Sequence, residues 1–420
     1  MKFQQVSLRF ITQIGAITPV VFRGVATFLL NKLVASYFGA QGLSLFGTGA
    51  NIMSVLNVSA AGGTYNGIVQ LFSSNSNTKE DYSAISVLTC FGALFSLLII
   101  SSLFLFTNIS KEVTISLFSV FCLLLAYIGY SIASVLNAKF SAQKQILHFG
   151  IYGMTSGIFY IVFILIAIIG FKYNNPIAIL SAFPISLLVC AIPFIYKTLE
   201  NFKKNQINHQ IVLEKIKFLF KFSLMALSSA FLTPIAQIII RNSIERNAGL
   251  TTAGEWQALL RFSDILNILI GSYITVKIYP KTFGWLLVRA NATIGLDSSL
   301  KILQVALVFP IINIFFGAQI SHFLYSNSLN LDTITLFSYL LGDSFKIASI
   351  VLGYMIVSTG SPQTYLVFDL TNNFLLVASS IGGYFFGGLQ MLSIFYLGYS
   401  VFWFLFLRGY IIRKLSHMGA

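Results

Sequence analysis

The sequence predicts an all-α polytopic membrane protein with about twelve transmembrane helices, and three observations support this prediction. Of the 420 residues, 56% are hydrophobic and only 9% are charged, whereas a soluble domain carries about 25% charged residues. The mean hydropathy is +0.84, and no soluble fold of this size could bury so much apolar surface. Long apolar stretches recur along the chain, and the alternating ten-residue strands of a membrane barrel are absent from the sequence.

The apolar stretches set the number of spans. Crossing a bilayer core of about 30 Å takes roughly 20 helical residues. Twelve stretches are long enough, near residues 10–38, 43–71, 82–106, 112–137, 145–171, 176–196, 216–241, 252–279, 299–318, 332–358, 362–386 and 388–412. The first lacks a small-residue cleavage site, so we expect an uncleaved span rather than a signal peptide.

Basic residues predict the orientation. With the N-terminus inside, seventeen of the 26 Lys and Arg residues fall in cytoplasmic segments, and only Lys111, Lys172, Arg241 and Arg246 fall in the opposite loops. Because cytoplasmic loops are enriched in Lys and Arg, both termini are predicted to be cytoplasmic, in the inner membrane of a bacterium. The net charge of +14 therefore reflects topology, and we expect no nucleic-acid partner.

The longest basic connection, 197–217, lies at the middle of the chain. It predicts an N-terminal six-helix lobe over 1–196, a basic cytoplasmic linker over 197–215 and a C-terminal six-helix lobe over 216–420. An even number of spans in each half is typical of parallel repeats. Pro19 and Pro234, each preceded by Thr, occupy comparable places in the first and seventh spans and suit kinks.

Several kinds of chemistry are disfavoured. Cys90, Cys122 and Cys190 are dispersed in apolar runs, which argues against a disulfide framework, and no histidine or second cysteine lies at metal-ligand spacing. We therefore expect no metal, no cofactor and no catalytic residues. The loops are too short for an extramembrane catalytic domain, so a membrane glycan polymerase or ligase is the least favoured alternative.

Charged residues inside the spans are the strongest functional signal. A charge at mid-membrane costs at least about 2.5–3.5 kcal/mol, so such residues usually face water. The cations are Arg23, Lys32, Arg261, Lys277 and Lys346, and the acids are Glu255, Asp264, Asp343 and Asp369. Lys32, Lys277 and Glu255 lie nearer to span ends, where snorkelling to the interface explains them equally well.

These charges lie on polar helix faces. At steps of three or four residues the stripes contain Gln13, Arg23, Thr27 and Asn31; Thr233, Gln237 and Arg241; Gln257, Arg261, Asp264, Asn267, Gly271 and Thr275; Asp343, Lys346, Ser349 and Gly353; and Asp369, Asn372 and Asn373. Several helices with one polar face each predict a shared wet interior.

Two interpretations of the charges stay open. Arg261 with Asp264, and Asp343 with Lys346, could be i,i+3 pairs that only neutralise each other. Arg23 has no acid within a turn and indicates an anionic partner, and a guanidinium suits a phosphate or diphosphate. The spans contain more cations than acids, which favours as the substrate an amphiphile with an anionic head and a lipid tail. Sugar stacking on Trp256 or Tyr273 is a further hypothesis.

Three stretches carry a family resemblance: AAGGTYNGIVQ (60–70), NAGLTTAGEWQALLRFSDILNILIGSYITVKIYPK (247–281) and LGDSFKIASIVLGYMIVSTG (341–360). The chain resembles the multidrug/oligosaccharidyl-lipid/polysaccharide exporter (MOP) superfamily, and within it the Wzx-type O-antigen and enterobacterial common antigen flippases. The resemblance implies two six-helix lobes around a central cavity. It also implies transport of an undecaprenyl-diphosphate-linked oligosaccharide from the cytoplasmic to the periplasmic leaflet, with a polysaccharide polymerase and a chain-length regulator as candidate partners.

The resemblance also implies residue roles. Related lipid II flippases bind the diphosphate through arginines in the spans that here contain Arg23 and Arg261, although fourteen spans in those proteins disfavour lipid II as the substrate. We expect the diphosphate to meet Arg23, Arg261, Lys346, Lys277 and Lys32. We expect ion coupling, by alternating access, at Asp264, Asp343, Asp369 or Glu255, and polar cavity contacts from Gln13, Asn31, Gln237, Gln257, Asn267 and Asn372. A drug or metabolite:cation antiporter of the same superfamily is the main alternative.

Overall fold

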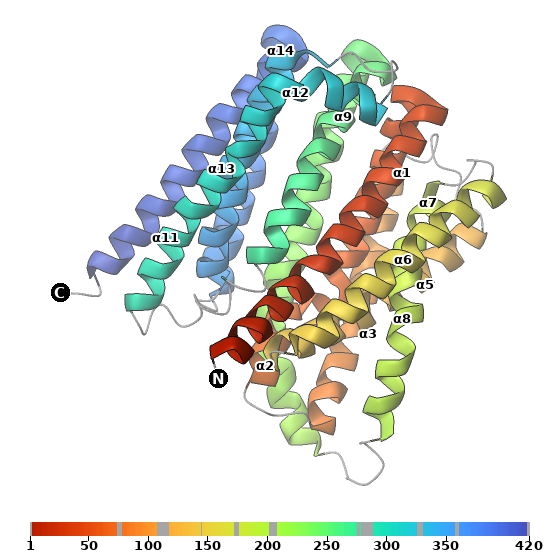
Figure 1. The fold of residues 1–420 in the computed structure, drawn as a ribbon, viewed down its shortest axis with the longest axis vertical. Helices are drawn as coiled ribbons and strands as arrows, with labels where there is room; N and C mark the ends of the chain where they lie inside the picture. The colour runs from red at the N-terminus through yellow and green to blue at the C-terminus, as the bar shows by residue number, and fades with distance from the viewer. Residues whose placement is uncertain are drawn as a thin grey trace. The chain divides into compact units, whose positions relative to one another are not determined.

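A computed structural model describes residues 2–73, 78–106, 117–143, 145–171, 176–200, 208–274, 278, 289–325, 331–357 and 361–417, and these residues are almost entirely helical. The elements are α1 (Lys2–Ser59), η1 (Ala60–Gly63), α2 (Tyr65–Ser73), α3 (Lys79–Phe106), α5 (Leu117–Ala142), α6 (Ile146–Phe171), α7 (Pro176–Leu180), α8 (Ala182–Glu200), α9 (His209–Tyr273), α11 (Arg289–Ala306), α12 (Val308–Tyr325), α13 (Thr333–Val357) and α14 (Pro362–His417) (Figure 1). Within these ranges, nine helices are long and apolar enough to cross a membrane. The prediction of an all-α polytopic membrane protein is confirmed.

Glycines break three of the long helices and restore the predicted number of spans. The backbone leaves helical geometry at Gly39 in α1, at Gly249 in α9 and at Gly387 and Gly388 in α14, with φ of 65°, 85° and 66° at Gly39, Gly249 and Gly388. Glycine adopts such positive φ without steric cost. Two of the nine apolar helices contain one of these breaks, and a shorter apolar helix covers Gly24–Ser36. The described helical segments therefore follow the order of the twelve predicted spans.

The chain forms two compact units. Unit 1 contains residues 1–26 and 48–234, and unit 2 contains residues 27–47 and 235–420. This division differs from the predicted lobes 1–196 and 216–420 with their linker at 197–215, which stay a prediction. The difference is that the first part of α9 packs in unit 1, while residues 27–47 of α1 pack in unit 2.

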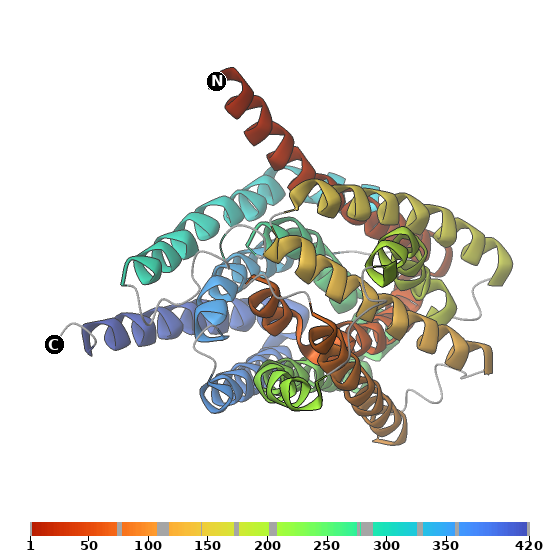
Figure 2. The same ribbon diagram turned by 90° about the horizontal axis from the view of Figure 1, so that it is seen from below.

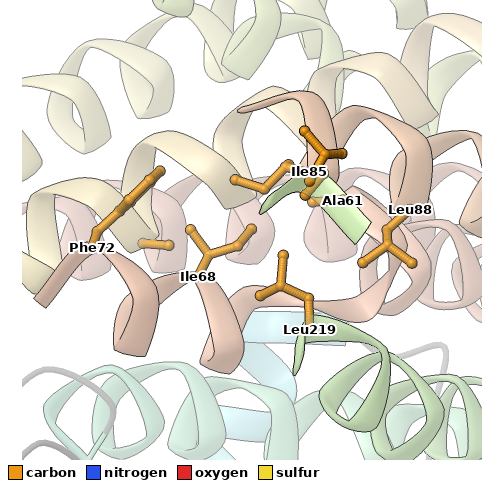
Figure 3. Close-up of a cluster of buried hydrophobic side chains, with 9 residues drawn as sticks. Ala61, Ile68, Phe72, Ile85, Leu88 and Leu219 are labelled. Carbon is orange, nitrogen blue, oxygen red and sulfur yellow. The ribbon is translucent and has the colours of Figure 1, made fainter. Parts of the chain in front are cut away.

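A buried apolar cluster explains why the first part of α9 packs in unit 1. Figure 3 shows Leu219 of α9 among Ile68 of α2 and Ile85 and Leu88 of α3, and all four side chains are almost completely buried. A Cβ added at Gly67 would lie 2.9 Å from the Leu219 side chain, so α2 and α9 approach closely. Burying this apolar surface fastens α9 to α2 and α3.

An ion pair fastens the start of α3 to the same part of α9. Asp81 is fully buried, and its Oδ1 lies 2.5 Å from the Nζ of Lys215. The backbone N–H of Thr78 donates to Asp81 Oδ2 at 2.8 Å, which caps the N-terminus of α3. Lys215 also donates to the Thr78 hydroxyl at 2.8 Å. We call Thr78, Asp81 and Lys215 the α3–α9 clip.

The motif at residues 60–63 interrupts a helix inside unit 1. Ala61, Gly62 and Gly63 all have positive φ, and a Cβ on Gly62 would lie 2.3 Å from the backbone oxygen of Leu88. Side chains bond to backbone groups at the break: the Ala61 N–H donates to the Ser131 hydroxyl at 3.1 Å. Such partners are required because lipid offers no hydrogen bonds to exposed backbone.

Unit 2 is built around α13 and α14, which run beside each other in Figure 1 and Figure 2. The break at Gly387 and Gly388 divides α14 into two arms, one before it and one after it. The two arms fold back on each other, since a Cβ on Gly383 would lie 2.8 Å from the Phe395 side chain. Residues 27–47 of α1 contact α9, where Arg241 Nη1 donates to the backbone oxygen of Ser44 at 3.2 Å. The assignment of Arg241 to a loop is therefore wrong, because α9 continues past it to the break at Gly249 and Arg241 is buried within unit 2.

The contact between α1 and α9 predicts an intolerant glycine. A Cβ at Gly254 would lie 2.0 Å from the backbone oxygen of Ala40, whereas a Cβ at Gly271 in the same helix meets no atom within 4 Å. Because the clash is with backbone, Gly254→Val should lower the free energy of unfolding by about 3 kcal/mol. Thermal unfolding of the purified full-length protein measures this. Gly271→Val is the matched control, and equal melting temperatures for the two variants would contradict the packing described.

Candidate functional site

A cavity of about 310 Å³ lies within unit 2, between α13 and the two arms of α14. Its lining residues recur at helical spacing, so each helix contributes one face. They are Lys346, Ser349, Ile350, Gly353, Tyr354, Ile356 and Val357 of α13, with Tyr365, Phe368, Asp369, Asn372, Trp403 and Leu407 of α14. We call this cavity the α13–α14 pocket.

The pocket joins two of the predicted polar stripes. Lys346 and Ser349 come from the stripe on the tenth predicted span, and Asp369 and Asn372 come from the stripe on the eleventh. Three residues predicted to contact substrate or ion, Lys346, Asp369 and Asn372, therefore line one cavity. The sequence predicted each stripe separately, and the structure brings these two together.

Lys346 is the cation of the pocket. Its side chain is half-buried, and its Nζ lies 5.6 Å from the centroid of the Tyr396 ring, within the range of a cation–π interaction. Across the ranges that the structure describes, the ammonium has no hydrogen bond and no ion pair within 4.0 Å. The ammonium is thus placed where an anionic group could bind it.

Asp343 lies one turn before Lys346 and is closed off from solvent. It is 1% exposed, and its Oδ1 accepts a hydrogen bond of 2.6 Å from the Tyr396 hydroxyl. Tyr339 stacks on Tyr396 with the ring centroids 4.4 Å apart. Asp343 and Lys346 form no direct ion pair; the carboxylate bonds to the hydroxyl of Tyr396, and the ammonium lies over its ring. The charge of Lys346 still acts on the Asp343 carboxylate, so the interpretation of the two residues as a neutralising pair stays open.

The interpretation as a neutralising pair fits Arg261 and Asp264. Arg261 Nη1 lies 2.7 Å from Asp264 Oδ2, and the two residues are one helical turn apart on α9. Their side chains are 17% and 40% exposed, so the pair is partly accessible. Arg261 is not among the residues that line the α13–α14 pocket. An anionic ligand at Arg261 would therefore compete with Asp264.

Hydrogen bonds from other α14 side chains position Asp369 and Asn372, the polar residues that α14 contributes to the pocket. Asn373 Nδ2 donates to Asp369 Oδ1 at 3.1 Å and to the Asp369 backbone oxygen at 2.9 Å. The Tyr399 hydroxyl donates to Asn372 Oδ1. Because the oxygen of Asn372 is already an acceptor, its amide N–H groups are the ones available to a ligand.

The remaining predicted residues lie elsewhere. Glu255, Gln237, Asn31 and Lys32 are half-buried, Gln257 is buried, and Asn267 donates to the Ser263 hydroxyl at 3.1 Å. A Cβ on Gly47 would lie 2.3 Å from the Gln257 side chain, which shows that Gln257 fills a packed contact. The side chains of Gln13, Arg23 and Lys277 lie outside the described residues. Over the described ranges, no group of three or more His, Cys, Asp or Glu residues could hold a metal.

The aromatic side of the pocket was missed by the sequence analysis. Trp403 and Phe368 pack against each other with ring centroids 6.2 Å apart, and Tyr354 and Tyr365 complete the lining. Trp256, which was considered for sugar stacking, is 3% exposed and has no face available. The chain holds 41 Phe and 19 Tyr, so an aromatic residue beside a polar stripe is a weak signal.

Comparisons with known proteins give the fold a context. No family model matches the chain. Lipid III flippase of Escherichia coli is 22% identical over 369 residues, covering 84% of this chain and 86% of that protein, and the Shigella flexneri protein matches equally. Among solved structures, a mutant of the Vibrio cholerae MATE transporter VcmN has a TM-score of 0.70 at 14% identity, covering 98% of both chains. The chain has the MATE transporter fold.

Further structures support the MATE fold. A MATE protein in complex with MaL6 has a TM-score of 0.69 at 15% identity and covers 97% of this chain and 99% of its own. An outward-facing multidrug resistance MATE family transporter of the MOP superfamily has a TM-score of 0.66 at 12% identity, covering 96% and 98%. The proteins matched here are flippases and transporters, not enzymes, in agreement with the prediction of a transport protein.

The bond between Tyr396 and Asp343 predicts a stability change. Tyr396→Phe removes the donor and leaves a buried carboxylate without this hydrogen bond, which should cost about 2 kcal/mol of unfolding free energy. Tyr384→Phe, in the same helix and half-buried, is the matched control. Thermal unfolding of both purified variants measures the effect. A melting temperature for Tyr396→Phe equal to that of the control would mean that the bond contributes nothing.

Proposed function

We propose that this protein is a flippase that moves a polyprenyl-diphosphate-linked oligosaccharide from the cytoplasmic to the periplasmic leaflet of a bacterial inner membrane by alternating access. The substrate class is an undecaprenyl-linked O-antigen-type repeat unit. The observation that carries the proposal is the α13–α14 pocket, where the Lys346 ammonium has neither a hydrogen bond nor an ion pair among the described residues. A membrane transporter for an anionic, sugar-bearing lipid needs such a group.

The physical argument rests on the cost of charge in hydrocarbon. An ammonium at bilayer depth costs at least about 2.5 kcal/mol unless it faces water or an anion. A lipid-linked headgroup supplies anions, and its polyprenyl tail stays in the bilayer while the headgroup crosses. The proposal assigns the diphosphate to guanidinium groups, Arg261 and Arg23, since a guanidinium binds phosphate oxygens through two parallel hydrogen bonds.

The similarity to lipid III flippase supports a lipid substrate for this chain. The likeness extends over most of both chains and is not confined to one motif. An orientation with both termini in the cytoplasm, from the positive-inside count, belongs to the same proposal. With this orientation, the C-terminal end of α13 and the start of α14 lie toward the cytoplasm.

A drug or metabolite:cation antiporter is the second candidate. The observation that favours it is the combination of Asp369 and Trp403 in the pocket, because a carboxylate and an aromatic face suit an organic cation. The solved structures of MATE transporters have the same fold. Drug sensitivity on deletion, with normal surface glycan, is the expected behaviour of an antiporter and not of the proposed flippase.

The diphosphate assignment predicts a loss of export. In cells whose surface glycan depends on this protein, Arg23→Ala and Arg261→Ala should each reduce surface glycan more than tenfold, because the diphosphate loses a bidentate partner. Membrane insertion, followed by immunoblot of the membrane fraction, should be unchanged. Arg246→Ala, at an exposed position of α9, is the control. Normal surface glycan from both test variants would refute the assignment.

Ion coupling predicts a response to gradients. Asp369 lines the pocket and is held by Asn373, so its carboxylate is placed to exchange a proton or bind a cation. Flux of a labelled lipid-linked oligosaccharide in proteoliposomes should rise with an imposed pH gradient or membrane potential. Asp369→Asn should abolish that rise, while Asp297→Asn, exposed on α11, should retain it. Wild-type flux that ignores both gradients would eliminate coupling.

A further inference from the structure

We propose that the first part of α9 holds an anionic phospholipid, whose phosphodiester headgroup binds to Lys217 and Lys221. The site lies wholly within unit 1, where α9 runs beside α3. It would serve a flippase or an antiporter alike, because the lipid belongs to the surrounding bilayer and is not the transported molecule. In the sequence analysis these two lysines counted only toward the orientation of the chain.

The three lysines at the start of α9 lie on two different faces of the helix. Successive residues of an α-helix are turned by about 100°, so Lys215 shares a face with the buried Leu219, whereas Lys217 and Lys221 point the opposite way. Lys215 is held by the α3–α9 clip. Lys217 and Lys221 are exposed, and within the part of the chain that the structure describes neither has a hydrogen bond or an ion pair. The inner lysine is therefore neutralised, and the two outer lysines retain their donors for a ligand.

Apolar side chains surround the two outer lysines. Leu213, Phe220 and Leu224 are all exposed, and at helical spacing they share one stripe with Lys217 and Lys221. An exposed apolar stripe on a helix of a membrane protein contacts acyl chains, which are as apolar as leucine. The two ammonium groups therefore lie on the lipid-facing side of α9.

The apolar part of the site extends from α9 to α3. Phe220 contacts Phe91 of α3, with the ring centroids 5.9 Å apart, and both rings are exposed. Leu94, almost one turn after Phe91, continues the exposed apolar surface along α3. An acyl chain can thus lie against both helices while its headgroup stays at the lysines.

The α3–α9 clip indicates the level of the headgroups, because polar residues of both helices meet there. A helix rises about 1.5 Å per residue, so Lys217 and Lys221 follow Lys215 by about 3 Å and about 9 Å along α9. The headgroup region of one leaflet is roughly 5–7 Å thick. An ammonium at this depth reaches phosphate oxygens, because the long lysine side chain can snorkel toward them.

The charge of the surroundings matches one phosphodiester. Residues 79–81 and 209–221 contain four lysines and three acids, which leaves a net charge of +1: Lys79, Lys215, Lys217 and Lys221, with Glu80, Asp81 and Glu214. Asp81 is paired with Lys215, and Glu80 accepts the backbone N–H of Asn208 at 3.4 Å. Glu214 is exposed, about 4.5 Å of helix rise before Lys217, and so lies farther from the apolar surface. One anionic phospholipid with a single negative charge balances the remaining positive charge.

Competition between two phospholipids tests the inference. Full-length protein in detergent micelles is incubated with phosphatidylglycerol and phosphatidylcholine of identical acyl chains, and native mass spectrometry measures which lipid stays bound. Phosphatidylglycerol should bind about tenfold more tightly, because the ammonium groups give charge-assisted hydrogen bonds to its phosphate and its headgroup carries no opposing cation. Inorganic phosphate should not displace it, since phosphate has no chain to contact Phe220 and Phe91.

Matched double variants locate the site. Lys217→Gln with Lys221→Gln should lower the affinity for phosphatidylglycerol about tenfold and leave that for phosphatidylcholine unchanged, which separates loss of charge from loss of folding. Replacing the same two residues by arginine keeps the charge and should keep the preference. Lys301→Gln with Arg413→Gln removes two exposed cations from α11 and α14 and should also keep it.

Three results would overturn the inference: equal affinities of the unmodified protein for the two lipids, a preference for phosphatidylglycerol that survives Lys217→Gln with Lys221→Gln, or displacement of the lipid by inorganic phosphate. The proposed function is tested separately, by surface glycan in the Arg23 and Arg261 variants, so the two failures are distinguishable.

Discussion

The constraint on which unit 2 depends is that a charge placed in hydrocarbon must find a partner or water. Tyr396 meets this constraint for two charges at once, since its hydroxyl bonds to Asp343 and its ring lies beneath the Lys346 ammonium. The same aromatic residue therefore contacts both the carboxylate and the ammonium. Because α14 turns back at Gly387 and Gly388, residues from both of its arms line the pocket beside α13. Lys346 is one of the α13 residues that line this pocket.

The charged residues of the described helices thus fall into two groups. In closed pairs, such as Arg261 with Asp264 and Asp81 with Lys215, each charge is compensated by its neighbour. Lys346 represents the other group, in which a side chain is stabilised by an aromatic ring and retains its donors. Only the second group can bind a ligand without first breaking a bond inside the protein. This difference, rather than the number of charges, is the reason why the proposal of a ligand site starts from the α13–α14 pocket.

Sequence patterns predicted local features of this protein well and distant ones poorly. The spans and the stripes on α13 and α14 follow from hydropathy and helical spacing, and the Arg261–Asp264 pair follows from i,i+3 geometry. Trp403 could not be singled out, because an aromatic residue in a span usually faces lipid or packs. Arg241 resembled a loop residue, since nothing nearby marks the continuation of α9 to Gly249. The packing of Leu219 in unit 1 depends on partners far away in sequence.

The α3–α9 clip has a consequence for biosynthesis. Asp81 is made early, but its partner Lys215 is added only after the sixth predicted span and the following connection have been translated. Until then a buried carboxylate lacks its counter-charge, and the apolar cluster lacks Leu219. Unit 1 therefore cannot complete these contacts until the first part of α9 has been translated. A fragment that ends between residues 201 and 207 would lack both Lys215 and Leu219, and unit 1 would stay incomplete.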